Sequence, residues 1–128
     1  MGWVQVREET FNDAVKHLSR ALELSPGDLN MLNLRARAFK ELGQMENAYN
    51  DATAILAKNK NHAMARVIAA DYLRMNGKLE DAMAEYETAA RNIETKAYAE
   101  HYIEVIKQKL EEEEIEREYQ ERLKNQAN

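Results

Sequence analysis

The 128 residues contain no cysteine, which excludes a disulfide framework, a thiolate nucleophile and a cysteine-based zinc site. Proline occurs once and glycine four times, so the chain has few of the turn residues that strands and hairpins need. No apolar run approaches the roughly 18–20 residues that span a bilayer, and no signal-like segment opens the chain. We therefore expect an all-α, soluble, cytoplasmic protein with no membrane partner.

Positive charge is also in short supply. Lysine and arginine number 18 against 23 aspartates and glutamates, and the formal net charge is −5. Binding to nucleic acid depends on clustered lysines and arginines that neutralise phosphates, and the sequence has no basic stripe. We therefore expect no nucleic-acid partner.

Residues that carry chemistry do not gather into a motif. The three histidines, His17, His62 and His101, lie far apart and form no His-Glu-x-x-His pattern. The acidic residues follow solvent-facing helix positions, and four isolated glycines build no phosphate loop, dinucleotide fingerprint or nucleophile elbow. The sequence predicts no metal, no cofactor and no enzymatic activity.

What the sequence does have is a repeat with a period of about 34 residues, the length of one helix–turn–helix unit. Several independent series of small residues keep this one register. Small side chains in the middle of helices allow two helices to approach closely, and a glycine at a helix end takes a left-handed conformation at little cost. The series are Ala14, Ala48 and Ala82; Ala36 and Ala70; and Gly43 and Gly77.

Three stretches of this repeat, residues 14–27, 34–43 and 77–86, closely resemble tetratricopeptide sequences. The resemblance covers residues 1–96 and implies an all-α, tetratricopeptide-like helix–turn–helix solenoid. Full units are expected at about 29–62 and 63–96. The first unit is truncated, because the register places the start of its first helix before Met1 and leaves only residues 2–8, followed by a second helix from about Asn12 to Leu24. We expect a piece excised from a longer array; a degenerate first unit is the alternative.

Residues 97–128 are expected to form a long C-terminal capping helix with a charged extension. Glu104 and Glu111 stand where the earlier units have a small residue and a glycine, so no fourth unit is predicted. Ile115, Tyr119 and Leu123 resume an apolar stripe after four consecutive glutamates. The extension is either a solvated helix or a pairing helix, although a coiled coil needs three or four heptads and this segment supplies about one and a half.

The concave surface of such a solenoid, lined by the first helix of each unit, is the expected binding groove for a protein or peptide partner. Four of its apolar members, Leu34, Met64, Val67 and Ile68, could instead be ordinary contacts between neighbouring units. The predicted groove residues are Leu34, Arg37, Met64, Val67, Ile68, Asp71, Tyr98 and Tyr102.

Many tetratricopeptide proteins bind the acidic EEVD-type tail of chaperones through a clamp of lysines, arginines and asparagines. The slots of that clamp fall here on Trp3, Leu34, Met64 and Ile68, none of which is a suitable donor. The resemblance therefore implies a protein-interaction scaffold or adaptor, but not one for that tail. The alternative is a self-assembly module that forms a homo-oligomer through its open N-terminal end or its C-terminal helix.

Overall fold

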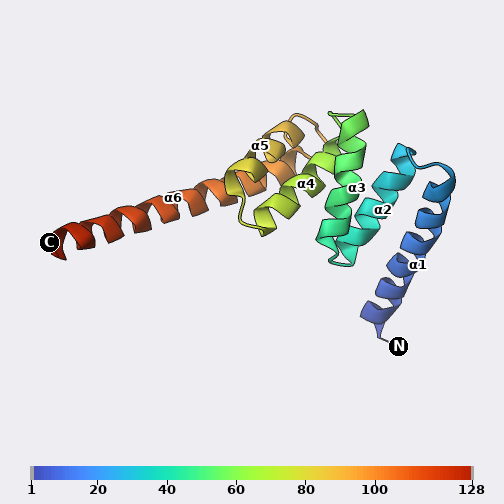
Figure 1. Ribbon diagram of the computed structural model, residues 1–128, viewed down its shortest axis with the longest axis horizontal. Coiled ribbons are helices and arrows are strands. Elements are labelled where there is room, and N and C mark those ends of the chain that lie inside the picture. The colour runs from blue at the N-terminus through green and yellow to red at the C-terminus, as the bar shows by residue number, and fades with distance from the viewer. Residues whose placement is uncertain (1, 128) are drawn as a thin grey trace.

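The computed structural model describes residues 2–127, and within this range every regular element is a helix. Helix accounts for 83% of these residues, which confirms the all-α prediction. The helices stack side by side in chain order, and the last one projects from the stack (Figure 1). Their bounds are α1 Trp3–Leu24, α2 Leu29–Glu41, α3 Met45–Lys58, α4 Ala63–Met75, α5 Leu79–Ala89 and α6 Lys96–Ala127.

The two full units are repeated almost residue for residue. Helix α4 begins and ends one repeat after α2, and α5 begins one repeat after α3. Each pair packs as an antiparallel hairpin, α2 with α3 and α4 with α5, and α2 also contacts α4. The repeat register therefore describes the structure as well as the sequence.

Glycine closes the first helix of each full unit. Gly43 and Gly77 have φ angles of 75° and 79°, the left-handed region that other residues rarely adopt. Gly43 N–H donates to the carbonyl of Lys40, and Gln44 N–H donates to that of Phe39, which satisfies carbonyls that the helix end would leave unpaired. These turns are the ones expected from the sequence.

The core consists largely of alanine. Ala36 and Ala48 are fully buried in one cluster, and Ala70 and Ala82 are fully buried in a second. Because a methyl group fills little space, the backbones of the paired helices come close together at these points. Met64 packs against both clusters and joins them.

Helix α1 differs from the expectation for the first unit. The sequence was expected to form a short first helix and a second helix starting near Asn12, but α1 is unbroken from Trp3 to Leu24. The register places Glu9 where Gly43 and Gly77 end the first helices of the full units. Glutamate favours helix and disfavours the left-handed turn, so the chain continues straight instead of reversing.

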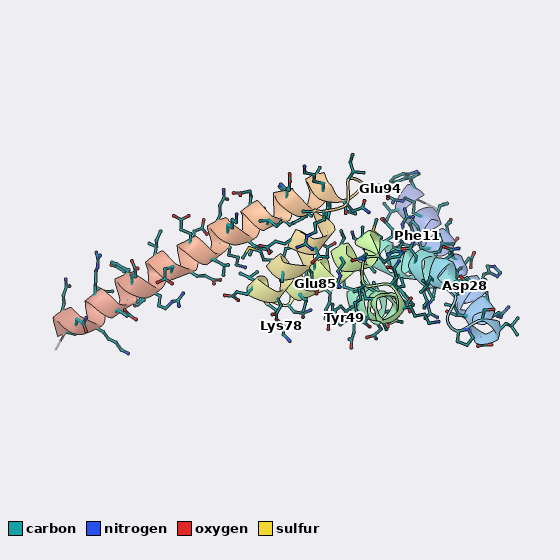
Figure 2. All side chains as sticks on the ribbon, turned by 90° about the horizontal axis from the view of Figure 1, so that it is seen from above. Phe11, Asp28, Tyr49, Lys78, Glu85 and Glu94 are labelled. Carbon is teal, nitrogen blue, oxygen red and sulfur yellow. The ribbon has the colours of Figure 1, made fainter. Side chains whose placement is uncertain are left out.

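Helix α6 caps unit three and then leaves it. Ala99 and Ile106 are buried in the second core cluster, as expected for a capping helix, whereas every side chain from 111 to 127 is exposed. Figure 2 shows the side chains of this extension standing away from the rest of the molecule. Despite its 32 residues, neither α6 nor any other helix in the described range is apolar enough to cross a membrane.

We predict that Ala70→Leu lowers the free energy of unfolding by about 1–3 kcal/mol, because three extra carbons must fit between close-packed α4 and α5. Ala84→Leu is the matched control, since Ala84 is exposed on α5 and leucine is nearly as good a helix former. Urea unfolding followed by circular dichroism measures both. Equal losses in the two variants would contradict the close packing at Ala70.

Candidate functional site

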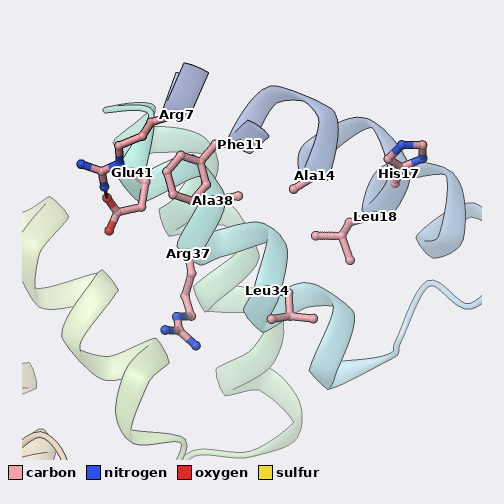
Figure 3. Close-up of a pocket in the computed structure, with 9 residues that line it drawn as sticks. All are labelled: Arg7, Phe11, Ala14, His17, Leu18, Leu34, Arg37, Ala38 and Glu41. Carbon is pink, nitrogen blue, oxygen red and sulfur yellow. Dashed lines mark hydrogen bonds and ion pairs between the residues drawn. The ribbon is translucent and has the colours of Figure 1, made fainter. Parts of the chain in front are cut away.

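An open groove with a volume of about 620 Å³ lies between α1 and α2. Figure 3 shows Ala14 and Leu18 projecting from α1 toward a space that Leu34 and Ala38 approach from α2. Phe11 closes one end of the floor, so the bottom of the groove is apolar. The lining residues are Arg7, Phe11, Ala14, His17, Leu18, Leu34, Arg37, Ala38 and Glu41.

Charged side chains stand along the rim of this groove. Arg7 donates to a carboxylate oxygen of Glu41 at 3.4 Å, which ties the open ends of α1 and α2 together. Both partners are about half exposed, so the pair contributes at most about 1 kcal/mol to stability. Arg37 is exposed on the α2 side, and its neighbour Leu34 leaves 51% of its surface open to solvent.

The groove lies where a helix is present in the other units. Ala48 and Ala82 are fully buried beneath the first helix of their own unit, whereas their register equivalent Ala14 is only half-buried. Leu18 is half-buried in the same way, although its equivalent in unit three, Tyr86, is completely buried. The first unit thus presents the packing face of its second helix with no first helix on it in the described chain.

The remaining predicted groove residues do not line an open surface. Val67 is 3% exposed and Ile68 is fully buried, so neither can contact a partner without unfolding. Their expected place in the groove is corrected: Ile68 packs against residues of the preceding unit, which is the other reading of the sequence, whereas Val67 packs in the cluster formed by α4, α5 and α6. Helix α4 packs against α5 of its own unit and against α3 and α2 of the preceding one, which is why these positions are enclosed. Met64 is half-buried between the two core clusters.

Asp71, also expected in the groove, is instead the centre of a buried polar network. It is 1% exposed and accepts hydrogen bonds from the hydroxyls of Tyr86 and Tyr98, the latter at 2.8 Å. Lys40 Nζ lies 3.1 Å from the same carboxylate, and Arg74 lies 3.6 Å from it. One carboxylate therefore joins α2, α4, α5 and α6.

Aromatic rings cover this network. The ring of Tyr102 stacks on that of Tyr86 with centroids 5.6 Å apart, and the guanidinium of Arg74 sits 4.0 Å from the Tyr102 centroid. Lys40 Nζ lies 5.1 Å from the ring of Tyr98, whose side chain is partly exposed. The expected groove residues Tyr98 and Tyr102 thus make contacts within the chain, although Tyr98 keeps 37% of its surface open to solvent.

Burial shifts the titration of the two hydrogen-bonded tyrosines. Burial and the hydrogen bond to Asp71 raise the pKa of Tyr86 well above its ordinary value, and the same two causes raise the pKa of Tyr98. Both effects favour the neutral phenol, since a phenolate would lie beside the Asp71 carboxylate, and Tyr86 is completely shielded from solvent. The network therefore favours the protonated form of both tyrosines.

A second buried ion pair was not anticipated from the sequence. Arg35 donates to both carboxylate oxygens of Asp51, at 2.8 and 2.6 Å, and to the hydroxyl of Ser19 at 3.2 Å. The hydrogen bond to Asp51 raises the pKa of Arg35. This arginine joins α1, α2 and α3. The repeat register is the one feature of the sequence that indicates the burial of Asp51, because this residue lies between Ala48 and Ala52 on the packed face of α3.

The histidines have no shared site. His62 caps the N-terminus of α4, where its Nδ1 accepts from Ala65 N–H at 3.2 Å. His17 lines the rim of the α1–α2 groove, and His101 packs edge-on against Tyr102. Across residues 2–127 no three histidine, aspartate or glutamate side chains come together as metal ligands would.

A second candidate surface is the apolar stripe on the extension of α6. Ile115, Tyr119 and Leu123 are 59%, 55% and 42% exposed, and their spacing of four places them along one side of the helix. Glutamates and arginines surround this stripe, with Glu114 and Arg117 paired at 3.0 Å. The stripe is short, and it lies at the opposite end of the molecule from the α1–α2 groove (Figure 1).

We predict that stability falls as the pH rises above about 10, the pKa of tyrosine in the unfolded chain. Above that pH the unfolded state loses protons that the folded state keeps on Tyr86 and Tyr98, so unfolding becomes more favourable. Tyr86→Phe should flatten this alkaline loss, although losing one buried hydrogen bond to Asp71 lowers stability at pH 7 by about 1–3 kcal/mol. Urea titrations between pH 8 and 11 measure the free energy of unfolding of both proteins. Tyr119→Phe, at an exposed site, should leave the pH dependence of the free energy of unfolding unchanged. An unaltered alkaline slope in Tyr86→Phe would contradict the role given to Tyr86 in the Asp71 network.

No family model matches the sequence, and no curated protein matches it significantly. Several solved structures are similar to the chain. The type III secretion translocator chaperone SycD of Yersinia enterocolitica superposes with a TM-score of 0.71 at 20% identity, covering 84% of this chain and 79% of that one. The first tetratricopeptide domain of Spaghetti (RPAP3), bound to the HSP90 peptide SRMEEVD, gives 0.66 at 21% identity, over 84% and 92% of the two chains.

The tetratricopeptide domain of Sgt2 from Aspergillus fumigatus is similar to the same degree, with a TM-score of 0.66 at 20% identity over 89% of this chain and 83% of that one. Identities this low establish the fold alone. The repeat register, the glycine turns and these superpositions agree, and the chain has a tetratricopeptide-like fold closed by a long C-terminal helix.

Proposed function

We propose that this chain is a protein-interaction adaptor that binds a segment of a partner protein in the groove between α1 and α2. The observation that carries the proposal is an apolar groove of about 620 Å³ whose floor, Ala14 and Leu18, corresponds to positions that are fully buried in the other two units. Exposed apolar surface of this kind is characteristic of a binding groove. The solved neighbours include a domain bound to a peptide, which is consistent with a protein partner.

This site is narrower than the concave groove expected from the sequence. It keeps Leu34 and Arg37 and leaves out the predicted residues of α4 and α6, because the Asp71 network occupies that part of the surface. Partner binding there would have to break hydrogen bonds to a buried carboxylate, which is costly. The α1–α2 groove requires no such rearrangement.

Self-assembly has one observation in its favour, the exposed stripe of Ile115, Tyr119 and Leu123 on α6. About one and a half heptads hold a coiled coil only weakly, and the seven glutamates between residues 111 and 123 repel their counterparts in a parallel pair. We therefore regard the adaptor as the better-supported function.

Leu34→Asp should abolish capture of the partner, because a carboxylate at the groove floor must be desolvated against apolar contacts. Affinity capture from cell lysate, quantified by mass spectrometry, should show at least a tenfold loss of groove-dependent proteins, equivalent to about 1.4 kcal/mol or more. Since Leu34 is half exposed, the variant should fold normally, which circular dichroism verifies.

The matched control is Ile93→Asp, which also replaces an exposed apolar residue, 89% open to solvent, by aspartate outside the groove. It should retain the proteins captured by the unaltered chain. An identical set of captured proteins for both variants would show that the α1–α2 groove is not the binding site.

The partner segment is not expected to be an acidic chaperone tail. Ile68 is buried, Leu34 and Met64 offer no donor, and Trp3 is exposed at the end of α1. Lys40, a donor nearby, already pairs with Asp71.

Isothermal titration with the peptide SRMEEVD should therefore show millimolar binding or none. Charge-assisted hydrogen bonds contribute about 1.5–3 kcal/mol each, so losing two weakens binding about a hundredfold or more. A dissociation constant near or below about ten micromolar that disappears when the peptide carboxylate is amidated would contradict the assignment of these slots.

A further inference from the structure

Building on the proposed function, we propose that the partner segment is an amphipathic helix that takes the place of the first helix of unit one. It lies antiparallel to α1, as α2 lies to α3 and α4 to α5, and it presents three features in order. An apolar residue comes first, a small residue follows four positions later against Ala14, and an acidic residue follows after four more, opposite Arg37. The proposal comes from the repeat itself, because the two full units show what covers the equivalent surface.

The small residue is required by the close packing at the alanine positions. Ala36 and Ala48 are both completely buried in one cluster, and Ala70 and Ala82 are both completely buried in the other. In each unit an alanine of the first helix accompanies the alanine of the second. Ala14 is the equivalent of Ala48 and Ala82, so a helix docking on α1 must also present a small side chain there in order to approach as closely.

The apolar residue is indicated by what surrounds Ile68. This side chain is fully buried in a cluster with Leu32 and Ala36, two residues of the preceding unit's first helix that are four positions apart. Its register equivalent on α2 is Leu34, which is half exposed in the groove. A helix with an apolar residue four positions before its small residue would cover Leu34 as α2 covers Ile68.

The acidic residue follows from the ion pair between units two and three. Lys40, four positions after Ala36, pairs with Asp71 at 3.1 Å. The register equivalent of Asp71 is Arg37, which carries the opposite charge and is exposed along the groove. A residue four positions after the small one would meet Arg37, and a carboxylate there restores the pair with reversed polarity.

The extension of α6 in a second copy fits this description poorly. Glutamates flank its apolar stripe, but Tyr119 stands between Ile115 and Leu123 at the central position, where a small residue is needed. A phenol ring in that place would hold the helix away from Ala14. The groove is therefore assigned to a partner helix and not to α6 of a second copy.

The test uses a labelled 18-residue peptide of alanine, glutamine and lysine that carries leucine, alanine and glutamate at successive four-residue spacings, with capped termini. Fluorescence anisotropy should detect binding to the full chain. Replacing the central alanine of the peptide by leucine should weaken binding about tenfold or more, and Leu34→Asp should abolish it.

Charge reversal provides the decisive control. In the Arg37→Glu protein the glutamate peptide should bind about threefold or more weakly, and a peptide with lysine in place of that glutamate should bind more tightly by a similar factor. Arg20→Glu, an exposed arginine of α1 outside the groove, should leave the ranking of the two peptides unchanged. The same ranking in Arg37→Glu as in the unaltered protein would overturn the assignment of the acidic position.

The outcomes separate this inference from the function on which it rests. If no peptide of the series binds while Leu34→Asp still loses the captured proteins, the helical partner is wrong and the adaptor function stands. If Leu34→Asp changes neither peptide binding nor the set of captured proteins, both the helical partner and the adaptor function are wrong. A dimer detected by light scattering that both Leu34→Asp and Tyr119→Glu dissociate would place the α6 stripe of a second copy in the groove and overturn the inference.

Discussion

The structure depends on one packing constraint, the close approach of paired helices at alanine. At Ala48 and Ala82 a second helix lies against the first helix of its unit with no space for a larger side chain. A helical hairpin of this kind buries too little surface to be stable alone, so each unit relies on its neighbours. By the same repeat register α1 carries a small residue, Ala14, on a face that is only half-buried.

Polar contacts then fix how successive units sit on one another. Arg35 connects α1, α2 and α3 through Asp51 and Ser19, and Asp71 connects α2, α4, α5 and α6. Buried charges of this kind contribute little net stability in general, yet removing one partner leaves the other uncompensated. Here they join helices of successive units and engage Asp71 and Tyr98, whereas the described residues that line the α1–α2 groove form no buried ion pair.

Much of the fold could be predicted from the sequence because it depends on local rules that repeat. The bounds of α2 and α4, the turns at Gly43 and Gly77 and the capping role of α6 follow from the repeat register and from helix-ending chemistry. The site was predicted less well. Periodicity places Asp71 and Ile68 on the inner side of α4, but whether that side is open depends on how closely α2 and α6 approach, which is a tertiary property. The sequence does mark the unbroken α1 at one position: Glu9 stands where Gly43 and Gly77 end the first helices of the full units.

The extension of α6 gives the molecule a rigid arm. From residue 111 to 127 the helix rises by about 25 Å at 1.5 Å per residue, and no other part of the described chain supports it. A group attached to its far end would be held at a set distance and direction from the helical stack. Inserting a single residue into the arm would turn that group by about 100° around the helix axis and advance it by only about 1.5 Å. A small change in the length of the arm therefore produces a large change in the direction in which the attached group points.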